Sequence, residues 1–273
     1  MKMQGQLEIA NLSDVGKKRP HNEDSTGTDA GNGLVVLADG MGGYKAGEVA
    51  SAIAITTVMH NIGQGLRGVK SGQMDAKTGL SGESFLVKQA VIEANNDIFS
   101  TANNEPLCRG MGTTIVAVLF YGNRLAVAHV GDSRLYRLRN DQLEQVTTDH
   151  SLIQELVARG LYTLEEAMAN TPKNLVTRAL GIESSVEVDV AEEEVQADDI
   201  YLLCSDGLND MVNDEEIRLT LRKYSANLVQ AAQELVRLAN QNGGKDNVSV
   251  VLVRKSGSSP QTGGFLKNLF KRS

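Results

Sequence analysis

Short apolar runs recur along the chain, and several of them end in Asp or Gly. Runs of this length that are rich in Val, Ile and Leu are typical of strands buried in a sheet. Two runs flank the short sequence Tyr121-Gly-Asn-Arg124, which predicts a hairpin and therefore antiparallel neighbours. The predicted strands cover residues 34–38, 114–120, 125–130, 200–204 and 248–253.

Helical periodicity is clear in three longer segments. Apolar residues recur every three or four positions in 48–60, 83–101 and 227–241, and a shorter amphipathic helix is predicted at 151–159. The helices are clustered and do not alternate strictly with the strands. This order favours a layered α+β domain over a doubly wound parallel sheet.

Composition and charge narrow the possible functions. The chain has 273 residues and a formal net charge of −7, which disfavours non-specific binding to nucleic acid because such binding depends on Lys and Arg. Cys108 and Cys204 are too few and too far apart for a disulfide framework or a zinc knuckle. The first 20 residues lack the apolar stretch of a signal peptide, and no window of about 18 residues is uninterrupted and apolar. We therefore expect a soluble, cytoplasmic protein that is a monomer.

Carboxylates repeatedly stand beside Gly or Asn where a predicted strand begins or ends. Hard divalent cations prefer oxygen ligands, and Gly allows a backbone carbonyl to approach as a ligand. A single Asp-Gly pair is more often an ordinary turn. Converging strand ends, however, would bring many like charges together and require a cation, so the pattern predicts a Mg²⁺ or Mn²⁺ site.

The same segments carry a family resemblance. Their order and spacing resemble the motif set of the metal-dependent PP2C-type (PPM) serine/threonine protein phosphatases, and the bacterial stand-alone members are the most similar. The resemblance extends from about Asp14 to Val253. The motifs are Arg19-Pro-His-Asn-Glu-Asp-Ser25, Asp39-Gly-Met-Gly-Gly43, Gly110-Met-Gly-Thr-Thr114, Val130-Gly-Asp-Ser-Arg134, Ser205-Asp-Gly-Leu208 and Asp246-Asn-Val-Ser249.

The resemblance implies a four-layer αββα sandwich with two central antiparallel sheets, helices outside them and metal ions in a cleft at one end. Asp39 would bridge two Mn²⁺ or Mg²⁺ ions, and the Gly40 carbonyl would contact one of them. Asp206 and Asp246 would hold the other ion. The resemblance also implies that Glu23 and Asp24 act largely through metal-bound water, that Asp132 and Asp206 form a weaker third site, and that Arg19 binds phosphate.

Elementary chemistry agrees with these roles. A phosphomonoester dianion resists attack by water, and two metal ions can lower the pKa of a bridging water while they offset the charge on the phosphoryl oxygens. Arg19 adds a planar, permanently charged group that suits phosphate oxygens, although it could also be a solvated member of the basic run Lys17-Lys-Arg19. Direct hydrolysis of this kind needs no covalent enzyme intermediate.

The sequence leaves several candidates for the group that donates a proton to the leaving group. Many eukaryotic members of the family carry His after the first Asp-Gly pair, whereas this chain has Met41, whose thioether cannot donate a proton. The candidates are a metal-bound water near Asp132, His21 and His150. His129 lies in an apolar run and is expected to be a core residue, and His60 is expected to be a capping or exposed residue.

The chain divides into a phosphatase domain at 1–255 and a flexible tail at 256–273, according to the resemblance and the composition. Within the domain, residues 147–181 correspond to the flap beside the active site, with Lys173 and Arg178 as candidate substrate contacts and Gly160 and Gly181 as candidate hinges. The tail is basic and apolar. It could bind a partner or an anionic membrane surface through Phe265, Leu266, Leu269 and Phe270, or it could be a disordered, solubilising end.

The combined prediction is a Mn²⁺- or Mg²⁺-dependent phosphatase that acts on phosphoserine and phosphothreonine in proteins and opposes a cognate bacterial Ser/Thr kinase. One alternative is a non-catalytic pseudophosphatase that binds phosphoproteins, which missing metal ligands would favour. Another is a metal-dependent enzyme that hydrolyses small phosphomonoesters.

Overall fold

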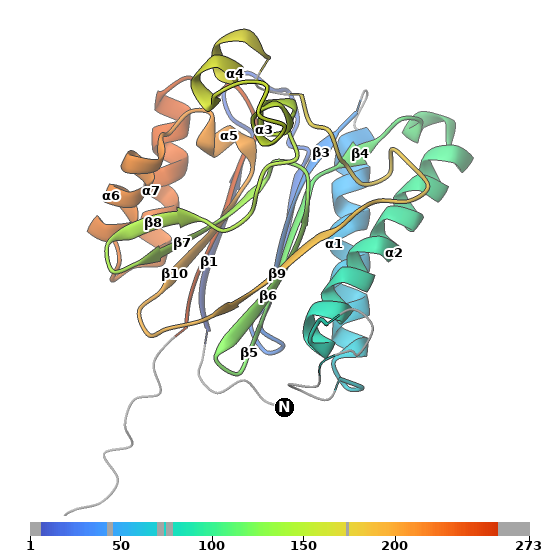
Figure 1. Ribbon diagram of the computed structural model, residues 1–273, viewed down its shortest axis with the longest axis horizontal. Coiled ribbons are helices and arrows are strands. Elements are labelled where there is room, and N and C mark those ends of the chain that lie inside the picture. The colour runs from blue at the N-terminus through green and yellow to red at the C-terminus, as the bar shows by residue number, and fades with distance from the viewer. Residues whose placement is uncertain (1–6, 43–45, 70–73, 75–78, 173–174, 256–273) are drawn as a thin grey trace, which may run out of the picture.

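Two antiparallel sheets pack face to face, and helices cover the outer face of each (Figure 1). The computed structural model describes residues 7–42, 46–69, 74, 79–172 and 175–255. Lys173 and the tail at 256–273 lie outside the described residues, so the interpretations made for them stay predictions. The arrangement confirms the predicted four-layer αββα sandwich.

The first sheet has five strands in the order β1-β11-β10-β7-β8. All of its neighbouring strands are antiparallel, and β11 lies between β1 and β10 although it comes last along the chain. The strands are β1 (Leu7–Asp14), β7 (Arg134–Arg139), β8 (Gln142–Gln145), β10 (Ile200–Cys204) and β11 (Val248–Lys255).

The second sheet has the strand order β2-β3-β5-β6-β9, with the short β4 beside β3. The predicted hairpin is confirmed, because Tyr121 pairs with Arg124 across the Gly122-Asn123 loop. The strands are β2 (Asp24–Asp29), β3 (Leu34–Met41), β4 (Gly112–Thr113), β5 (Ile115–Tyr121), β6 (Arg124–Val130) and β9 (Asp189–Glu194).

Three apolar clusters hold the four layers together. The long helices α1 (Ala46–Gly65) and α2 (Gly82–Asn104) pack on the second sheet, and α6 (Asp214–Lys223) and α7 (Leu228–Gln241) pack on the first. The cluster between the two sheets consists of residues such as Leu37, Val116 and Leu203. Among the described residues, no helix is both long enough and apolar enough to cross a bilayer.

Several elements were not predicted because their patterns are mixed. β1 and β2 have only some of their residues buried and β9 has none fully buried, so no continuous apolar run marks them. α6 begins with Asp214-Glu-Glu216 and buries only a narrow stripe, so its sequence is typical of a polar loop. Tertiary pairing, not local propensity, makes these segments regular.

The flap contains two short helices, α3 (Leu152–Ala158) and α4 (Leu164–Asn170). Its two ends pair with each other, because Thr177 N donates to His150 O and Leu152 N donates to Leu175 O.

Gly181 is not free to act as a hinge. Its N–H donates to Asn95 Oδ1 at 2.8 Å, and a Cβ there would lie 2.1 Å from Ile98. Gly160, at φ +68°, has open space around it.

The packing between the two sheets predicts how much stability is lost when a buried side chain there is shortened. Leu37 is fully buried between them, two residues before Asp39, whereas Leu107 is 85% exposed. We expect Leu37→Ala to lower the free energy of unfolding by about 2–5 kcal/mol and Leu107→Ala to change it by less than about 0.5 kcal/mol. Urea denaturation of both variants measures the difference. Equal effects would show that the sheets are not held together by this cluster.

Candidate functional site

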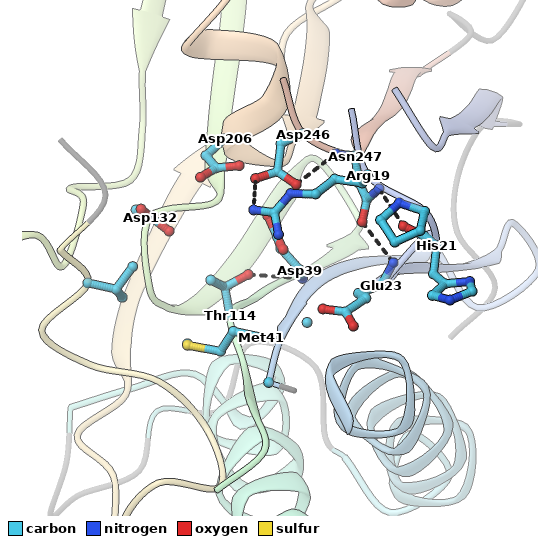
Figure 2. Close-up of a pocket in the computed structure, with 14 residues that line it drawn as sticks. Arg19, His21, Glu23, Asp39, Met41, Thr114, Asp132, Asp206, Asp246 and Asn247 are labelled. Atoms are coloured by element: carbon cyan, nitrogen blue, oxygen red, sulfur yellow. Dashed lines mark hydrogen bonds and ion pairs between the residues drawn. The ribbon is translucent and has the colours of Figure 1, made fainter. Parts of the chain in front are cut away.

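A cavity of about 670 Å³ opens at one end of the sandwich, where strands of both sheets begin or end. Figure 2 shows the carboxylates of Asp39, Asp206 and Asp246 and the guanidinium of Arg19 gathered in it. The residues that line the cavity are Arg19, Pro20, His21, Glu23, Asp39, Gly40, Met41, Gly42, Thr114, Asp132, Val176, Asp206, Asp246 and Asn247.

Strand register explains why the acidic residues meet. Asp24 at the start of β2 pairs directly with Asp39 near the end of β3. Asp132 follows β6, Asp206 follows β10, and Asp246 precedes β11. Because these strands are antiparallel, the end of one lies beside the start of the next, and the carboxylates reach one edge of the sandwich. Asp24 does not line the cavity but is buried behind Asp39.

Burial and mutual repulsion make these carboxylates hard to ionise. Burial, followed by the charges of Asp24, Asp206 and Asp132, raises the pKa of Asp39 well above its ordinary value. Burial and the neighbouring Asp132 and Asp246 raise the pKa of Asp206 to about 8. Burial and Asp149 raise the pKa of Asp132 to about 6. These carboxylates can all be ionised at neutral pH only if positive charge is bound beside them.

The donor set fits divalent cations. Oδ1 of Asp24 and Oδ1 of Asp206 are buried and have no hydrogen-bond partner in the described protein, a costly arrangement unless another group contacts them. The backbone is packed closely beside them: a Cβ at Gly40 would lie 2.1 Å from Gly47 O, and a Cβ at Gly47 would lie 2.6 Å from Glu23 Oε2. Oxygen atoms and tight glycine packing match a Mg²⁺ or Mn²⁺ site.

Two threonines hold the backbone of Asp39. Thr114 Oγ1 accepts a hydrogen bond from Asp39 N at 3.1 Å, and Thr113 Oγ1 donates to Asp39 O at 2.8 Å. Thr114 Oγ1 also lies 2.7 Å from Ser133 Oγ, next to Asp132. The segment before β5 therefore links the two carboxylates of the second sheet.

Asn247 joins the two ends of the domain at the cavity. Its Oδ1 accepts from Glu23 N at 2.8 Å, and its Nδ2 donates to both Val15 O and His21 O at 2.9 Å. One amide therefore fixes the segment that carries Arg19 and Glu23 against the start of β11.

Arg19 points into the cavity and contacts a carboxylate there. Its Nη2 donates to Asp246 Oδ2 at 2.7 Å, while about half of the side chain stays exposed. Asp246 thereby holds the guanidinium at the wall of the cavity (Figure 2).

The two candidate proton donors lie in different places. His21 lines the cavity at its edge, beside Glu23 (Figure 2). His150 does not line it and is 5% exposed. Its Nδ1 accepts from Gly131 N at 3.1 Å, and burial and the neighbouring His129 lower its pKa. His150 is thus a packed residue outside the cavity, and a direct proton transfer from it to a group in the cavity is not compatible with this position.

His150 belongs instead to a cluster at the base of the flap, in which the two imidazoles are buried and Arg178 and Asp189 are partly exposed. Its ring stacks on His129 with centroids 4.8 Å apart, and its Nε2 is 3.4 Å from Asp189 Oδ2. Arg178 Nη1 lies 2.8 Å from Asp189 Oδ1 and 3.3 Å from His150 Nε2. The guanidinium supplies the positive charge that an ion would bring, so Arg178 is a structural contact and this cluster is separate from the carboxylate site. His129 is the core residue that was predicted.

The roles of Asn247, Thr113 and Thr114 were not predicted. All three lie inside motifs recognised in the sequence, but a hydrogen bond across more than 70 residues leaves no local signal. An amide or hydroxyl directly beside a strand end is the sequence feature that could have indicated them.

The raised pKa of Asp206 predicts how stability depends on pH when no metal is bound. The folded state keeps a proton up to about pH 8, whereas an unfolded Asp releases it near pH 4. The corresponding stability is present below about pH 4 and is lost as the pH rises to about 8. In EDTA, the free energy of unfolding of the wild type should therefore fall as the pH is raised. We expect this fall to be smaller in Asp206→Asn by about 1 kcal/mol or more.

Urea unfolding at pH 5, 6.5 and 8 measures this effect. The matched control is Asp97→Asn, which changes an exposed carboxylate on α2. Identical pH dependence in wild type and Asp206→Asn would contradict the electrostatic account of the site.

Comparison with known proteins agrees with this geometry. The chain is 42% identical over 246 residues to the serine/threonine protein phosphatase PstP of Mycobacterium tuberculosis, and the alignment covers 90% of this chain but 44% of PstP. The chain thus spans less than half the length of that relative. It is 38% identical over 249 residues to the serine/threonine phosphatase stp of Listeria innocua, which covers 89% of this chain and 94% of that protein.

Solved structures show the same fold. The catalytic domain of PstP in complex with two manganese ions superimposes with a TM-score of 0.79 at 39% identity, over 93% of this chain and all of that chain. Stp1 of Staphylococcus aureus gives a TM-score of 0.80 at 32% identity, over 94% of this chain and 98% of that one. The sequence pattern that defines the family described as Protein phosphatase 2C matches residues 17–251. The chain therefore belongs to the protein phosphatase 2C family.

Proposed function

We propose that the chain is a Mn²⁺- or Mg²⁺-dependent protein phosphatase that hydrolyses phosphoserine and phosphothreonine. The observation that carries this proposal is the convergence of Glu23, Asp39, Asp206 and Asp246 with Arg19 in one cavity. Its support from relatives is that PstP and stp are serine/threonine phosphatases and that PstP binds two manganese ions in its solved structure.

Each oxygen ligand has a proposed place. Asp39 and the Gly40 carbonyl would contact the ions from the second sheet, and Asp206 and Asp246 from the first. The residues that would act through bound water, or hold a weaker third ion, are Glu23, Asp24 and Asp132. The unpartnered oxygens of Asp24 and Asp206 support this assignment.

When bound, the divalent ions would supply a water of lowered pKa and offset the charge on the phosphoryl oxygens. The protein supplies the geometry. Arg19 would bind phosphoryl oxygens through its planar group, held by Asp246. Thr113 and Thr114 keep the Asp39 backbone in place. In the proposed hydrolysis, the water oxygen would bond to phosphorus as the bond from phosphorus to the Ser or Thr oxygen breaks. The water would lose a proton and the leaving oxygen would take one up, so that the products are the free hydroxyl and inorganic phosphate.

The proton must come from a group at the cavity. Met41 lines it but has no proton to give, and His150 faces another part of the molecule. His21 is the histidine that remains near the site, and a water held by Asp132 is the other candidate.

Partners and location extend the proposal. The substrates would be phosphorylated proteins, and a cognate bacterial Ser/Thr kinase would produce them. We also propose that residues 1–255 form the catalytic domain, that 147–181 act as a flap, and that the enzyme is a cytoplasmic monomer. The tail at 256–273 would be dispensable for hydrolysis.

Removal of the central carboxylate tests the catalytic proposal. We expect Asp39→Asn to lower Mn²⁺-dependent turnover of a phosphothreonine peptide by at least about 100-fold, because the cavity would lose the carboxylate that lies between Asp24, Asp206 and Asp132. Asp97→Asn should leave the rate unchanged. Full activity of Asp39→Asn, or turnover of sugar phosphates but not of phosphopeptides, would refute the assignment as a protein phosphatase.

Arg19 should act through phosphate binding. We expect Arg19→Ala to lower kcat/KM for the phosphopeptide by about 10- to 100-fold, largely through a higher KM, and Arg19→Lys to recover part of the loss. A Mn²⁺ titration of each variant separates this effect from a disturbed Asp246. An unchanged KM in Arg19→Ala would remove Arg19 from the phosphate site.

A further inference from the structure

A second cavity opens beside the candidate active site. Its volume is about 760 Å³, and Asp132 and Asp206 line both cavities. It lies between the flap helices α3 and α4 and the segment that contains α5 (Asp206–Asn209) and the start of α6. Figure 1 shows α3 and α4 beside α5 at this end of the sandwich. When a phosphorylated residue occupies the first cavity, the residues next to it are within reach of the second.

The second cavity has an acidic wall. Six carboxylates and one guanidinium are among the described residues that line it. The guanidinium, Arg134, already pairs with Asp149 at 2.7 Å. Asp214 accepts a hydrogen bond from the neutral hydroxyl of Tyr136. Glu215 pairs with Arg218 but stays 61% exposed. Negative charge therefore exceeds positive charge inside this wall.

Metal binding in the first cavity would not remove that excess. Divalent ions would offset the charges of Asp132 and Asp206. Asp210, Asp214 and Glu215, however, line the second cavity and not the first. The dipole of α6 favours acidic residues in its first turn and accounts for Asp214 and Glu215.

Apolar side chains complete the wall. Leu164 and Met168 on α4 line the cavity and are 52% and 45% exposed, and Ile153 on α3 lies with them. A cavity with apolar walls and carboxylates matches a side chain with a hydrocarbon stem and a cationic tip, as in Arg and Lys.

We propose that the second cavity binds an Arg or Lys side chain of the substrate, close in sequence to the phosphorylated Ser or Thr. The enzyme would then prefer phosphoproteins with a basic residue near the phosphorylation site. This inference rests on the proposed phosphatase function and names its substrate class. The acidic wall would also disfavour acidic flanking residues through repulsion.

A positional scan tests the preference. A single Arg is placed at each of four positions on either side of phosphothreonine in a neutral peptide, and each peptide is compared with its Gln counterpart at saturating Mn²⁺. We expect kcat/KM to be about 5- to 10-fold higher for Arg at one or two positions on one side. The ratio should fall as ionic strength is raised, because salt screens the attraction.

Variants locate the preference in the cavity. Asp214→Asn combined with Glu215→Gln should reduce the ratio of Arg to Gln peptides to below about 2-fold. Because each enzyme form is its own reference, a loss of folded or metal-loaded enzyme cancels in the ratio. Glu215→Lys, at an exposed position, should shift the preference from Arg towards Glu. The matched control is Asp97→Asn combined with Glu105→Gln, which removes the same charge from exposed positions at α2 and should keep the wild-type ratio.

The outcomes separate the two proposals. If neutral phosphopeptides are hydrolysed but Arg and Gln peptides react equally at every position, the docking proposal is wrong and the phosphatase function stands. A preference that persists in the Asp214 and Glu215 variants would also overturn it. If no phosphopeptide is hydrolysed with any metal, the proposed function fails, and the inference fails with it.

Discussion

The structure depends on the concentration of buried carboxylates at one end of a stable sandwich. Asp24 and Asp39 face each other across two strands, and Asp206 and Asp246 approach from the other sheet. Without cations, burial and repulsion raise their pKa values, so the arrangement opposes folding. It persists because the rest of the domain supplies enough stability to hold them there. That excess is what allows a preformed site for divalent ions.

The domain holds these carboxylates together through rigid strands and close packing. The inter-sheet cluster, with Leu37 two residues before Asp39, sets the position of β3. Hydroxyls at Thr113 and Thr114 then fix the Asp39 backbone from the neighbouring segment, and Gly40 lets α1 approach. Ligands held on strands in this way need little rearrangement when an ion or a phosphate binds. Residues 147–181, by contrast, contain two short helices, α3 and α4, which contribute to the wall of the neighbouring second cavity.

Sequence alone predicted those parts of the fold that are buried on both faces, such as β5 and β10. It also indicated Asp39, Asp132, Asp206 and Asp246, because each stands where an apolar run begins or ends. Glu23 and Asp24, beside the polar strand β2, carry no such apolar signal and were indicated by the family resemblance. It did not predict β1, whose burial is intermittent, or β9, whose residues are half-buried or exposed, because both pair with strands that are distant in the sequence. The sequence also could not predict that His150 lies outside the cavity, because its position depends on contacts with Gly131 and Asp189 that form only in the folded chain.

The contacts of Asn247 also have a consequence for the growing chain. It binds Val15, His21 and Glu23 across more than 220 residues, and β11, which follows it, occupies an interior position of its sheet. Until residues 246–255 leave the ribosome, the cavity lacks Asp246 and the amide that positions Glu23, and one sheet lacks an interior strand. Catalysis by the nascent polypeptide is therefore excluded until synthesis of the domain is nearly complete. Unfinished fragments would have neither a complete fold nor activity.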